Sequence, residues 1–174
     1  MNLLADLRAK QALYSQYGQS CSLARAIFAD GTLANALYRM QAALVRWRLA
    51  PLALLPHWLN KCLNGCVLGV HVQFGPGLVL IHPVGVVINS AVRGGRNVWI
   101  ESGVVIGDNR GRTPMLGDDI FIGSGAKVIG GVSLGTGARI GANAVVLDDV
   151  APGVTVVGIP ARPVQARDPV PASL

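Results

Sequence analysis

The stretch that decides the fold runs from Leu116 to Val146 and reads LGDDIFIGSGAKVIGGVSLGTGARIGANAVV. Aliphatic residues recur in it at every sixth position: Leu116, Ile122, Val128, Leu134, Ile140 and Val146. Small or aliphatic residues stand two positions before most of these, and glycine follows four of them. This period matches neither the 3.6 residues of an α-helix nor the simple alternation of a strand. It predicts short strands joined by bends, where glycine or small polar residues accept a positive φ.

The same register extends upstream, with aliphatic positions at Ile88, Ile100 and Ile106. Gly94 breaks the series, and His82 occupies a slot where the repeat expects an aliphatic residue. The step from Ile106 to Leu116 is ten residues, which predicts a loop with four extra residues. Three such strands make one triangular coil of about eighteen residues, and stacked coils share an apolar core. We therefore expect about four coils between residues 70 and 148.

The residues before this repeat predict helices. One apolar stripe has helical spacing and leaves Arg39, Arg46 and Arg48 off it: Leu33, Leu37, Met40, Leu44 and Trp47. Gly31 and Thr32 precede this helix, and Pro51 is expected to end it. A shorter helix is expected from about Leu52 to Leu63, closed by Gly65. The predicted organisation is a helical region over 1–68, a β-helix over 69–165 and a tail over 166–174.

Two partners are open for the helical region. Its helices can pack on one another and on a neighbouring subunit, or the face with Trp47, Trp58 and the arginines can contact a membrane surface. The formal net charge of +6 suits an anionic cofactor or an acidic membrane. Nucleic acid is not expected as a partner, because the basic residues are scattered and no aromatic residues interleave with them.

The overall composition predicts an ordered cytoplasmic protein without a metal site. Hydrophobic residues make up 51% of the chain and charged residues only 14%, which excludes disorder. Charged residues interrupt the first ten positions, so no signal peptide is evident. Cys21, Cys62 and Cys66 match no zinc motif and are interpreted as buried, reduced thiols.

Particular residues carry a resemblance to a known family. The segment from His82 to Asn89, the ending from Val157 to Arg162 and the helical preface resemble the serine O-acetyltransferase branch of hexapeptide acyltransferases. The short enzymes that acetylate bacterial polysaccharides, the colanic-acid type, match the length best. The resemblance implies a left-handed coil, a homotrimer, and acetyl-CoA bound with its acceptor in a groove between adjacent coils.

The resemblance makes His82 the catalytic candidate, because the stretch from Phe74 to His82 aligns with the family segment that ends in the general base. An imidazole, whose unperturbed pKa is about 6.5, can accept the proton of an attacking hydroxyl at neutral pH. The family places an aspartate immediately before this base, where Ile81 stands here. Glu101 and Asp108 are therefore considered as alternative orienting carboxylates.

On the cofactor side the resemblance implies two bends that approach the pantetheine arm and a turn near the nucleotide. Their residues are Ser124, Gly125, Ala126, Lys127, Ala142, Asn143, Pro160 and Arg162. Small residues let backbone amides come close to the cofactor, and Arg162 could pair with a phosphate.

The acceptor side departs further from serine acetyltransferases. Thr113 stands where they carry a second histidine, and the neighbouring loop is short. The expected function is therefore transfer of acetyl from acetyl-CoA to a hydroxyl of a sugar or polysaccharide precursor. Two alternatives stay open: serine O-acetylation for cysteine synthesis, and a catalytically silent β-helix scaffold.

Overall fold

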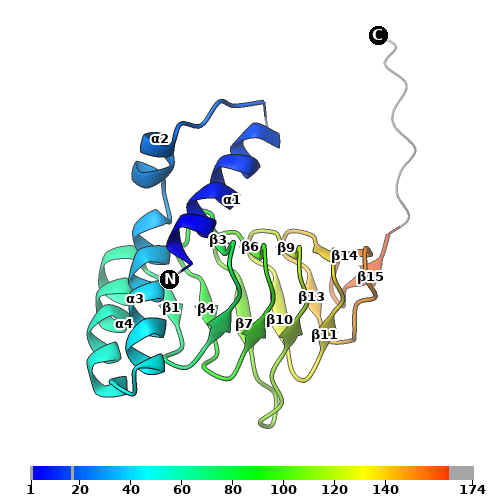
Figure 1. Ribbon diagram of the computed structural model, residues 1–174. Helices are drawn as coiled ribbons and strands as arrows, with labels where there is room; N and C mark the ends of the chain where they lie inside the picture. Colours follow the sequence, from blue (N-terminus) through cyan, green and yellow to red (C-terminus); the bar gives the residue numbers. More distant parts are fainter. Residues whose placement is uncertain (1, 17, 165–174) are drawn as a thin grey trace.

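A computed structural model describes residues 2–16 and 18–164, and the predicted tail over 166–174 lies outside them. The chain forms a parallel β-helix with helices at its N-terminal end (Figure 1). The helices are α1 (Leu3–Gln16), α2 (Leu23–Phe28), α3 (Thr32–Arg46) and α4 (Ala50–Asn64). The prediction of an all-β core of hexapeptide repeats with an N-terminal helical region is confirmed.

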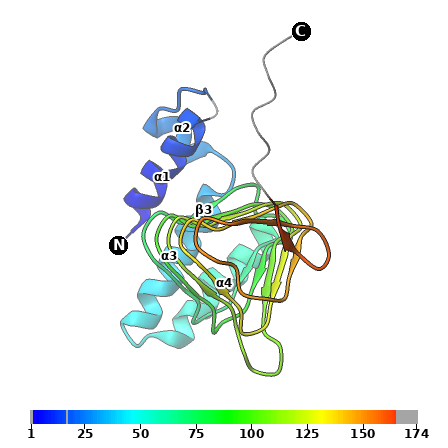
Figure 2. The same cartoon turned by 90° about the vertical axis from the view of Figure 1, so that its right-hand side faces the viewer.

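The strands form three parallel sheets, here called faces A, B and C. Face A contains β1 (Val67–Leu68), β4 (Val87–Ile88), β7 (Val105–Gly107), β10 (Lys127–Ile129) and β13 (Val145–Val146). Face B contains β2 (Gln73–Phe74), β5 (Arg93–Gly94), β8 (Met115–Leu116) and β11 (Ser133–Leu134). Face C contains β3 (Val79–Leu80), β6 (Trp99–Ile100), β9 (Phe121–Ile122), β12 (Arg139–Ile140), β14 (Thr155–Val157) and the antiparallel β15 (Arg162–Pro163). Figure 2, which looks along the stack, shows the three-sided outline of the coils.

The core consists of the residues that the six-residue period selected. The aliphatic positions from Leu116 to Val146 are at most 6% exposed, as are Ile88, Ile100 and Ile106. Strand register stacks them in columns, for example Ile88 against Ile106 and Ile106 against Val128 on face A. The predicted loop after Ile106 is also present, between β7 and β8 (Figure 1).

His82 does not occupy an aliphatic slot, so that part of the repeat prediction is wrong. The inward strand position of the first coil on face C is Leu80, which pairs with Ile100, and the corresponding strand position on face A is Ile88, which pairs with Leu68. The step between them is eight residues instead of six. The two extra residues widen the turn after β3, and His82 lies in that turn with its side chain 68% exposed.

Gly94 breaks the aliphatic series because a neighbouring ring fills its place. A Cβ atom on Gly94 would lie 2.2 Å from Cδ1 of Phe74, the residue paired with it in the preceding coil. Phe74 is itself buried against Tyr38 of α3, with the two rings in edge-to-face contact. The large side chain of one coil therefore replaces the missing side chain of the next.

The helices cover the open end of the first coil. The predicted helices over Leu33–Trp47 and Leu52–Leu63 are confirmed within a few residues, and Gly65 ends α4 in the left-handed conformation, with φ 57°. Two buried amide side chains join the helices to the coil and to each other. Gln41 Nε2 donates to the carbonyl of Gly69 (3.0 Å), and Asn60 Nδ2 donates to that of Ala34 (3.1 Å).

Arg39 is buried, although the helical pattern placed it on the polar side of α3. Its guanidinium donates to both carboxylate oxygens of Asp6 in α1 (2.7 and 2.8 Å) and to the carbonyls of Phe74 and Gly75. The amides of Gly77 and Leu78 also donate to Asp6 (2.9 and 3.0 Å). One ion pair thus docks α1 on α3 and on the turn before β3.

Only part of the cysteine prediction holds. Cys66 is buried, and this burial raises the pKa of its thiol to about 12, whereas Cys62 is exposed on α4. Among the described residues no helix has the length and apolar character to cross a bilayer.

Candidate functional site

The site lies at the edge where face C turns into face A, here called the C–A corner. Four turns stack along it, after β3, β6, β9 and β12. Backbone hydrogen bonds join each turn to the next, from Gly103 to Val84, from Gly125 to Ser102 and from Asn143 to Ser124 (2.8–2.9 Å). Gly125 has a φ of +71°, which favours glycine, and a Cβ on it would lie 2.2 Å from Oδ1 of Asn143.

His82 lies in the first of these turns and is paired with an aspartate from the helical region. Its Nδ1 is 2.9 Å from Oδ2 of Asp30, in the loop between α2 and α3. A carboxylate only accepts hydrogen bonds, so Nδ1 carries the proton and Nε2 of the neutral ring keeps its lone pair. The side chains are 68% and 73% exposed, so a reactant can approach the ring. This geometry leaves Nε2 free to accept a proton.

The loop that holds Asp30 is fixed on both sides. Gly31 has a φ of +79°, and a Cβ on it would lie 2.0 Å from the carbonyl oxygen of Leu80, two residues before His82. On the other side, the Lys10 ammonium donates to the Asp30 carbonyl and to Oγ1 of Thr32 (2.9 Å). Burial lowers the pKa of Lys10 to about 8, so the side chain is still mostly charged at neutral pH. Asp30 is therefore held beside His82 by close backbone packing as well as by hydrogen bonds.

A cavity of about 150 Å³ opens beside the His82–Asp30 pair. Its lining is contributed by α1, the Asp30 loop and two turns of the C–A corner: Lys10, Leu13, Tyr14, Asp30, Ile81, His82 and Glu101. Glu101 accepts hydrogen bonds from the amide (3.0 Å) and the hydroxyl of Ser124 in the next turn. The cavity thus presents an imidazole, one cation and two carboxylates within a partly apolar wall.

The two carboxylates expected as partners of His82 both form hydrogen bonds to other residues. Glu101 shares the cavity with His82, but its hydrogen bonds go to Ser124. Asp108 follows β7 on face A, at a different corner, and accepts from Asn89 Nδ2 and the amide of Gly111 (both 3.2 Å). The carboxylate that contacts His82 is Asp30, which the sequence reasoning missed.

The candidate cofactor residues of the two bends lie along the C–A corner. Ser124, Gly125, Ala142 and Asn143 are in the turns, and Lys127 extends back to the carbonyl of Gly125 (2.9 Å). Ala126 differs from these, because its side chain is fully buried in the core and only its backbone reaches the turn. Ala142 is an exposed residue, and within the described residues its amide donates to no backbone or side-chain acceptor.

Pro160 and Arg162 follow β14, at the C-terminal end of the corner. Both are exposed, and Arg162 Nη1 pairs with Asp148 at 3.0 Å. No group of three or more metal-ligating side chains occurs in residues 2–16 and 18–164.

Comparisons with known proteins agree with this architecture. Residues 113–148 match the family "Bacterial transferase hexapeptide (six repeats)". The chain is 38% identical over 129 residues to a serine acetyltransferase of Helicobacter pylori, a match that covers 72% of this chain and 75% of the relative. These similarities place the repeat and the region before it in one known group.

Two solved structures are similar over most of the chain. Soybean serine acetyltransferase complexed with serine has a TM-score of 0.83 and 33% identity, covering 94% of this chain and 68% of the other. Serine acetyltransferase from Brucella abortus in complex with coenzyme A has a TM-score of 0.85 and 26% identity, covering 94% and 66%. The relatives are serine acetyltransferases, so the comparisons support the wider group and not the polysaccharide subtype that the sequence favoured. The chain belongs to the serine acetyltransferase family of hexapeptide-repeat acyltransferases.

Proposed function

We propose that the chain transfers the acetyl group of acetyl-CoA to the side-chain hydroxyl of L-serine, with His82 as general base. The observation that carries this proposal is the His82–Asp30 pair, which lies at the mouth of a small cavity in a member of the serine acetyltransferase family. Attack on a thioester needs a placed base, a donor to the developing oxyanion and exclusion of water.

In the proposed reaction Nε2 of His82 accepts the proton of the serine hydroxyl as its oxygen attacks the thioester carbonyl. The carbon–sulfur bond then breaks, and the leaving thiolate receives the proton from the imidazolium. Asp30 accepts from Nδ1 throughout, which orients the ring and stabilises its transient positive charge.

The cavity supports a small zwitterionic acceptor. Its volume of about 150 Å³ is below the range of about 300–1,000 Å³ that is usual for larger ligands. The Lys10 ammonium suits an acceptor carboxylate, and the Glu101 carboxylate suits an acceptor ammonium group.

For acetyl-CoA we infer a position along the same C–A corner. The amide of Ala142, which has no acceptor among the described residues, is available as a donor to the pantetheine arm. Lys127 and Arg162 supply cations for the phosphates of acetyl-CoA. We also infer a homotrimer with this groove between adjacent subunits, as the family resemblance implies.

A second acceptor class, a saccharide, is favoured by one specific observation. The cavity wall carries the apolar Ile81 where serine acetyltransferases carry an aspartate, and Thr113 replaces their second histidine. Both replacements remove an ionisable group from the acceptor side.

Release of CoA from acetyl-CoA, followed with a thiol reagent, distinguishes these acceptors. The panel consists of L-serine, D-serine, glycine, free sugars and nucleotide sugars. We expect turnover with L-serine and none with glycine, which lacks the hydroxyl. Turnover confined to saccharides would contradict the proposed acceptor, and absence of turnover with every compound would contradict the proposed activity.

Replacing Asp30 by asparagine should lower kcat about tenfold and leave KM for acetyl-CoA unchanged. The amide can hold the ring only through a weaker hydrogen bond and cannot offset the charge of the imidazolium. The expected loss is modest because solvent already screens this exposed pair. Steady-state kinetics of Asp30→Asn measure it, and Asp149→Asn, an exposed aspartate that accepts from the Ser133 amide, is the matched control. Equal kcat for Asp30→Asn and the wild type would remove Asp30 from the mechanism.

A further inference from the structure

Helix α4 is oriented with its large apolar side chains toward solvent. Its fully buried positions are Ala53, Pro56 and Asn60, which are small or polar. Its exposed positions include large apolar residues, each more than half exposed: Leu52, Leu54, Leu55, Trp58 and Leu63. A helix of a soluble domain ordinarily buries its apolar stripe, so this orientation leaves a surface that lacks a partner within the described chain.

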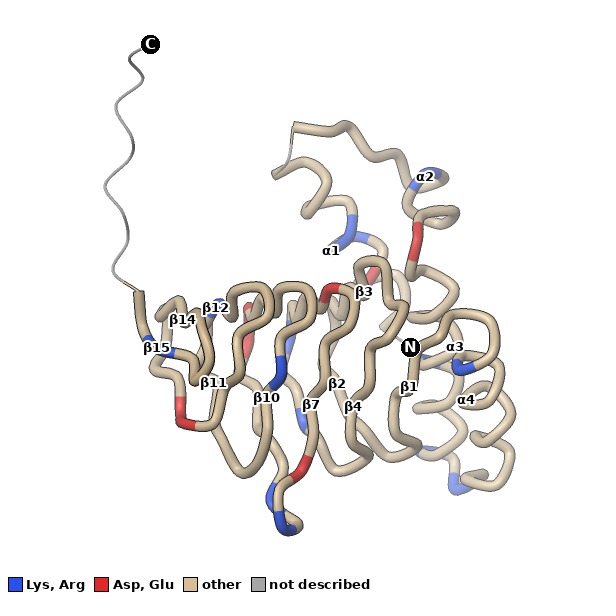
Figure 3. The backbone as a smooth tube through the Cα atoms, turned by 180° about the vertical axis from the view of Figure 1, so that it is seen from behind, with Lys and Arg blue, Asp and Glu red and all other residues tan. Residues whose placement is uncertain are grey.

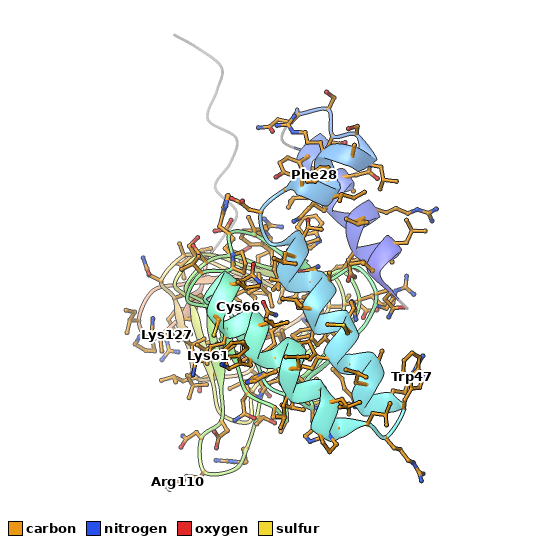
Figure 4. All side chains as sticks on the ribbon, turned by 90° about the vertical axis from the view of Figure 1, so that its left-hand side faces the viewer. Phe28, Trp47, Lys61, Cys66, Arg110 and Lys127 are labelled. Atoms are coloured by element: carbon orange, nitrogen blue, oxygen red, sulfur yellow. The ribbon has the colours of Figure 1, made fainter. Side chains whose placement is uncertain are left out.

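Helix α3 extends this apolar surface. Leu33, Met40 and Trp47 recur at intervals of seven and are 52%, 44% and 60% exposed. Leu49, between the two helices, is exposed as well. Figure 4 views the molecule from this end and shows α3 and α4 covering it, with Trp47 projecting outward. We call the exposed apolar residues of α3, α4 and the link between them the helical end surface.

The charge on the helical end surface has a single sign. The sequence contains no aspartate or glutamate between Asp30 and Glu101, so neither α3 nor α4 carries an acidic residue. Arg46, Arg48 and Lys61 are exposed at its margins. Figure 3 shows the same distribution, with basic and no acidic positions along α3 and α4.

We propose that the helical end surface docks peripherally on an anionic lipid bilayer. Leucine and tryptophan side chains enter the boundary between headgroups and acyl chains, while arginine and lysine remain at the level of the anionic headgroups. A negative membrane surface attracts each nearby basic residue, and this attraction adds to the apolar contact. The proposal is independent of the identity of the acceptor.

The charge distribution disfavours a second copy of the chain as the partner. In a two-fold symmetric contact the same patch of each molecule faces the other. Arg46, Arg48 and Lys61 of one copy would then face a patch whose charged residues are all basic, because α3 and α4 offer no carboxylate to neutralise them. An anionic bilayer can bury the apolar side chains and also place negative headgroups beside the cations.

Flotation of the full chain with lipid vesicles tests the proposal. We expect the protein to float with vesicles that contain equal amounts of phosphatidylcholine and phosphatidylglycerol, and to stay at the bottom with phosphatidylcholine alone. Added salt should weaken the binding, because the electrostatic part is screened. Failure of the wild type to float with anionic vesicles would overturn the proposal.

Variants separate the two contributions. Leu55→Ser with Trp58→Ser should abolish flotation, and Arg46→Ser with Arg48→Ser should lower the partition coefficient about tenfold or more. Leu147→Ser is the matched control, because Leu147 is 53% exposed and follows β13, away from the helices. Circular dichroism checks that each variant is folded, and acetyl transfer in solution should be unchanged. Undiminished flotation of Leu55→Ser/Trp58→Ser would overturn the proposal. It would also be overturned if the wild type forms a larger assembly that binds no vesicles and sedimentation shows that the double variant dissociates it.

Discussion

Replacing His82 by alanine should lower kcat for acetyl transfer by about 10²–10⁴-fold, the usual contribution of a positioned general base. The ring contributes little to the fold, because it is 68% exposed and, among residues 2–16 and 18–164, it is hydrogen-bonded to the exposed Asp30 alone. The variant should therefore keep the wild-type stability and its affinity for acetyl-CoA. Initial rates of CoA release at saturating acetyl-CoA measure the effect.

His71→Ala is the matched control for this experiment. His71 is an exposed histidine in the turn between β1 and β2, away from the C–A corner. Its backbone amide donates to Ser90 Oγ and its carbonyl accepts from Arg93 Nη1, and neither bond involves the imidazole ring. Its kcat should equal that of the wild type. If His82→Ala keeps more than half of the wild-type rate, another group is the base.

Replacing Asp6 by alanine should lower the free energy of unfolding by about 3–5 kcal/mol, because it leaves the Arg39 guanidinium buried without its counter-ion. The two side chains are 1% and 7% exposed, so water cannot replace the lost carboxylate. The change also leaves the amides of Gly77 and Leu78 without an acceptor. Urea denaturation followed by circular dichroism gives the change in unfolding free energy.

The matched control for Asp6→Ala is Asp149→Ala, which removes an exposed carboxylate that also accepts from a backbone amide. Its cost should stay below about 1 kcal/mol, as is usual for exposed positions. The Asp6→Ala variant has a second expected effect, because α1 also carries Lys10, which holds the Asp30 loop. An unfolding free energy equal to that of the wild type would show that the ion pair does not dock α1.

The β-helix could be predicted because its core repeats in sequence. Each inward slot needs an aliphatic side chain and each bend needs a small residue, so the pattern marks both Ile122 and Gly123 without reference to the rest of the chain. Exceptions were harder to interpret. Gly94 depends on Phe74, twenty residues away, and the turn with His82 is widened by two residues that a fixed period cannot register.

The site was only partly predictable because half of it comes from the helical region. The resemblance identified His82, but Asp30 is 52 residues away in sequence and meets it only when α1 and α3 dock on the first coil. The burial of Arg39 has the same origin, since its counter-ion lies 33 residues away. A helical pattern records which residues share a face, whereas the docking partner decides which face is buried.

Two kinds of comparison favour different acceptors for this chain. Single residues at the acceptor side favour a sugar, whereas the overall similarity favours serine. Ile81 and Thr113 led to the expectation of a sugar acceptor, whereas the relatives are serine acetyltransferases. Lys10 and Glu101 favour the proposed serine acceptor, because they bring charges of both signs into the cavity from outside the two replaced positions.

Product analysis tests the central claim most directly. Purified protein is incubated with acetyl-CoA and L-serine, and CoA and O-acetyl-L-serine are quantified in the same sample by mass spectrometry. The account predicts equal amounts of the two products for the wild type and, after the same incubation time within the linear range, at least about a hundredfold less of both for His82→Ala. CoA released without O-acetyl-L-serine, or equal product from the two proteins, would contradict it.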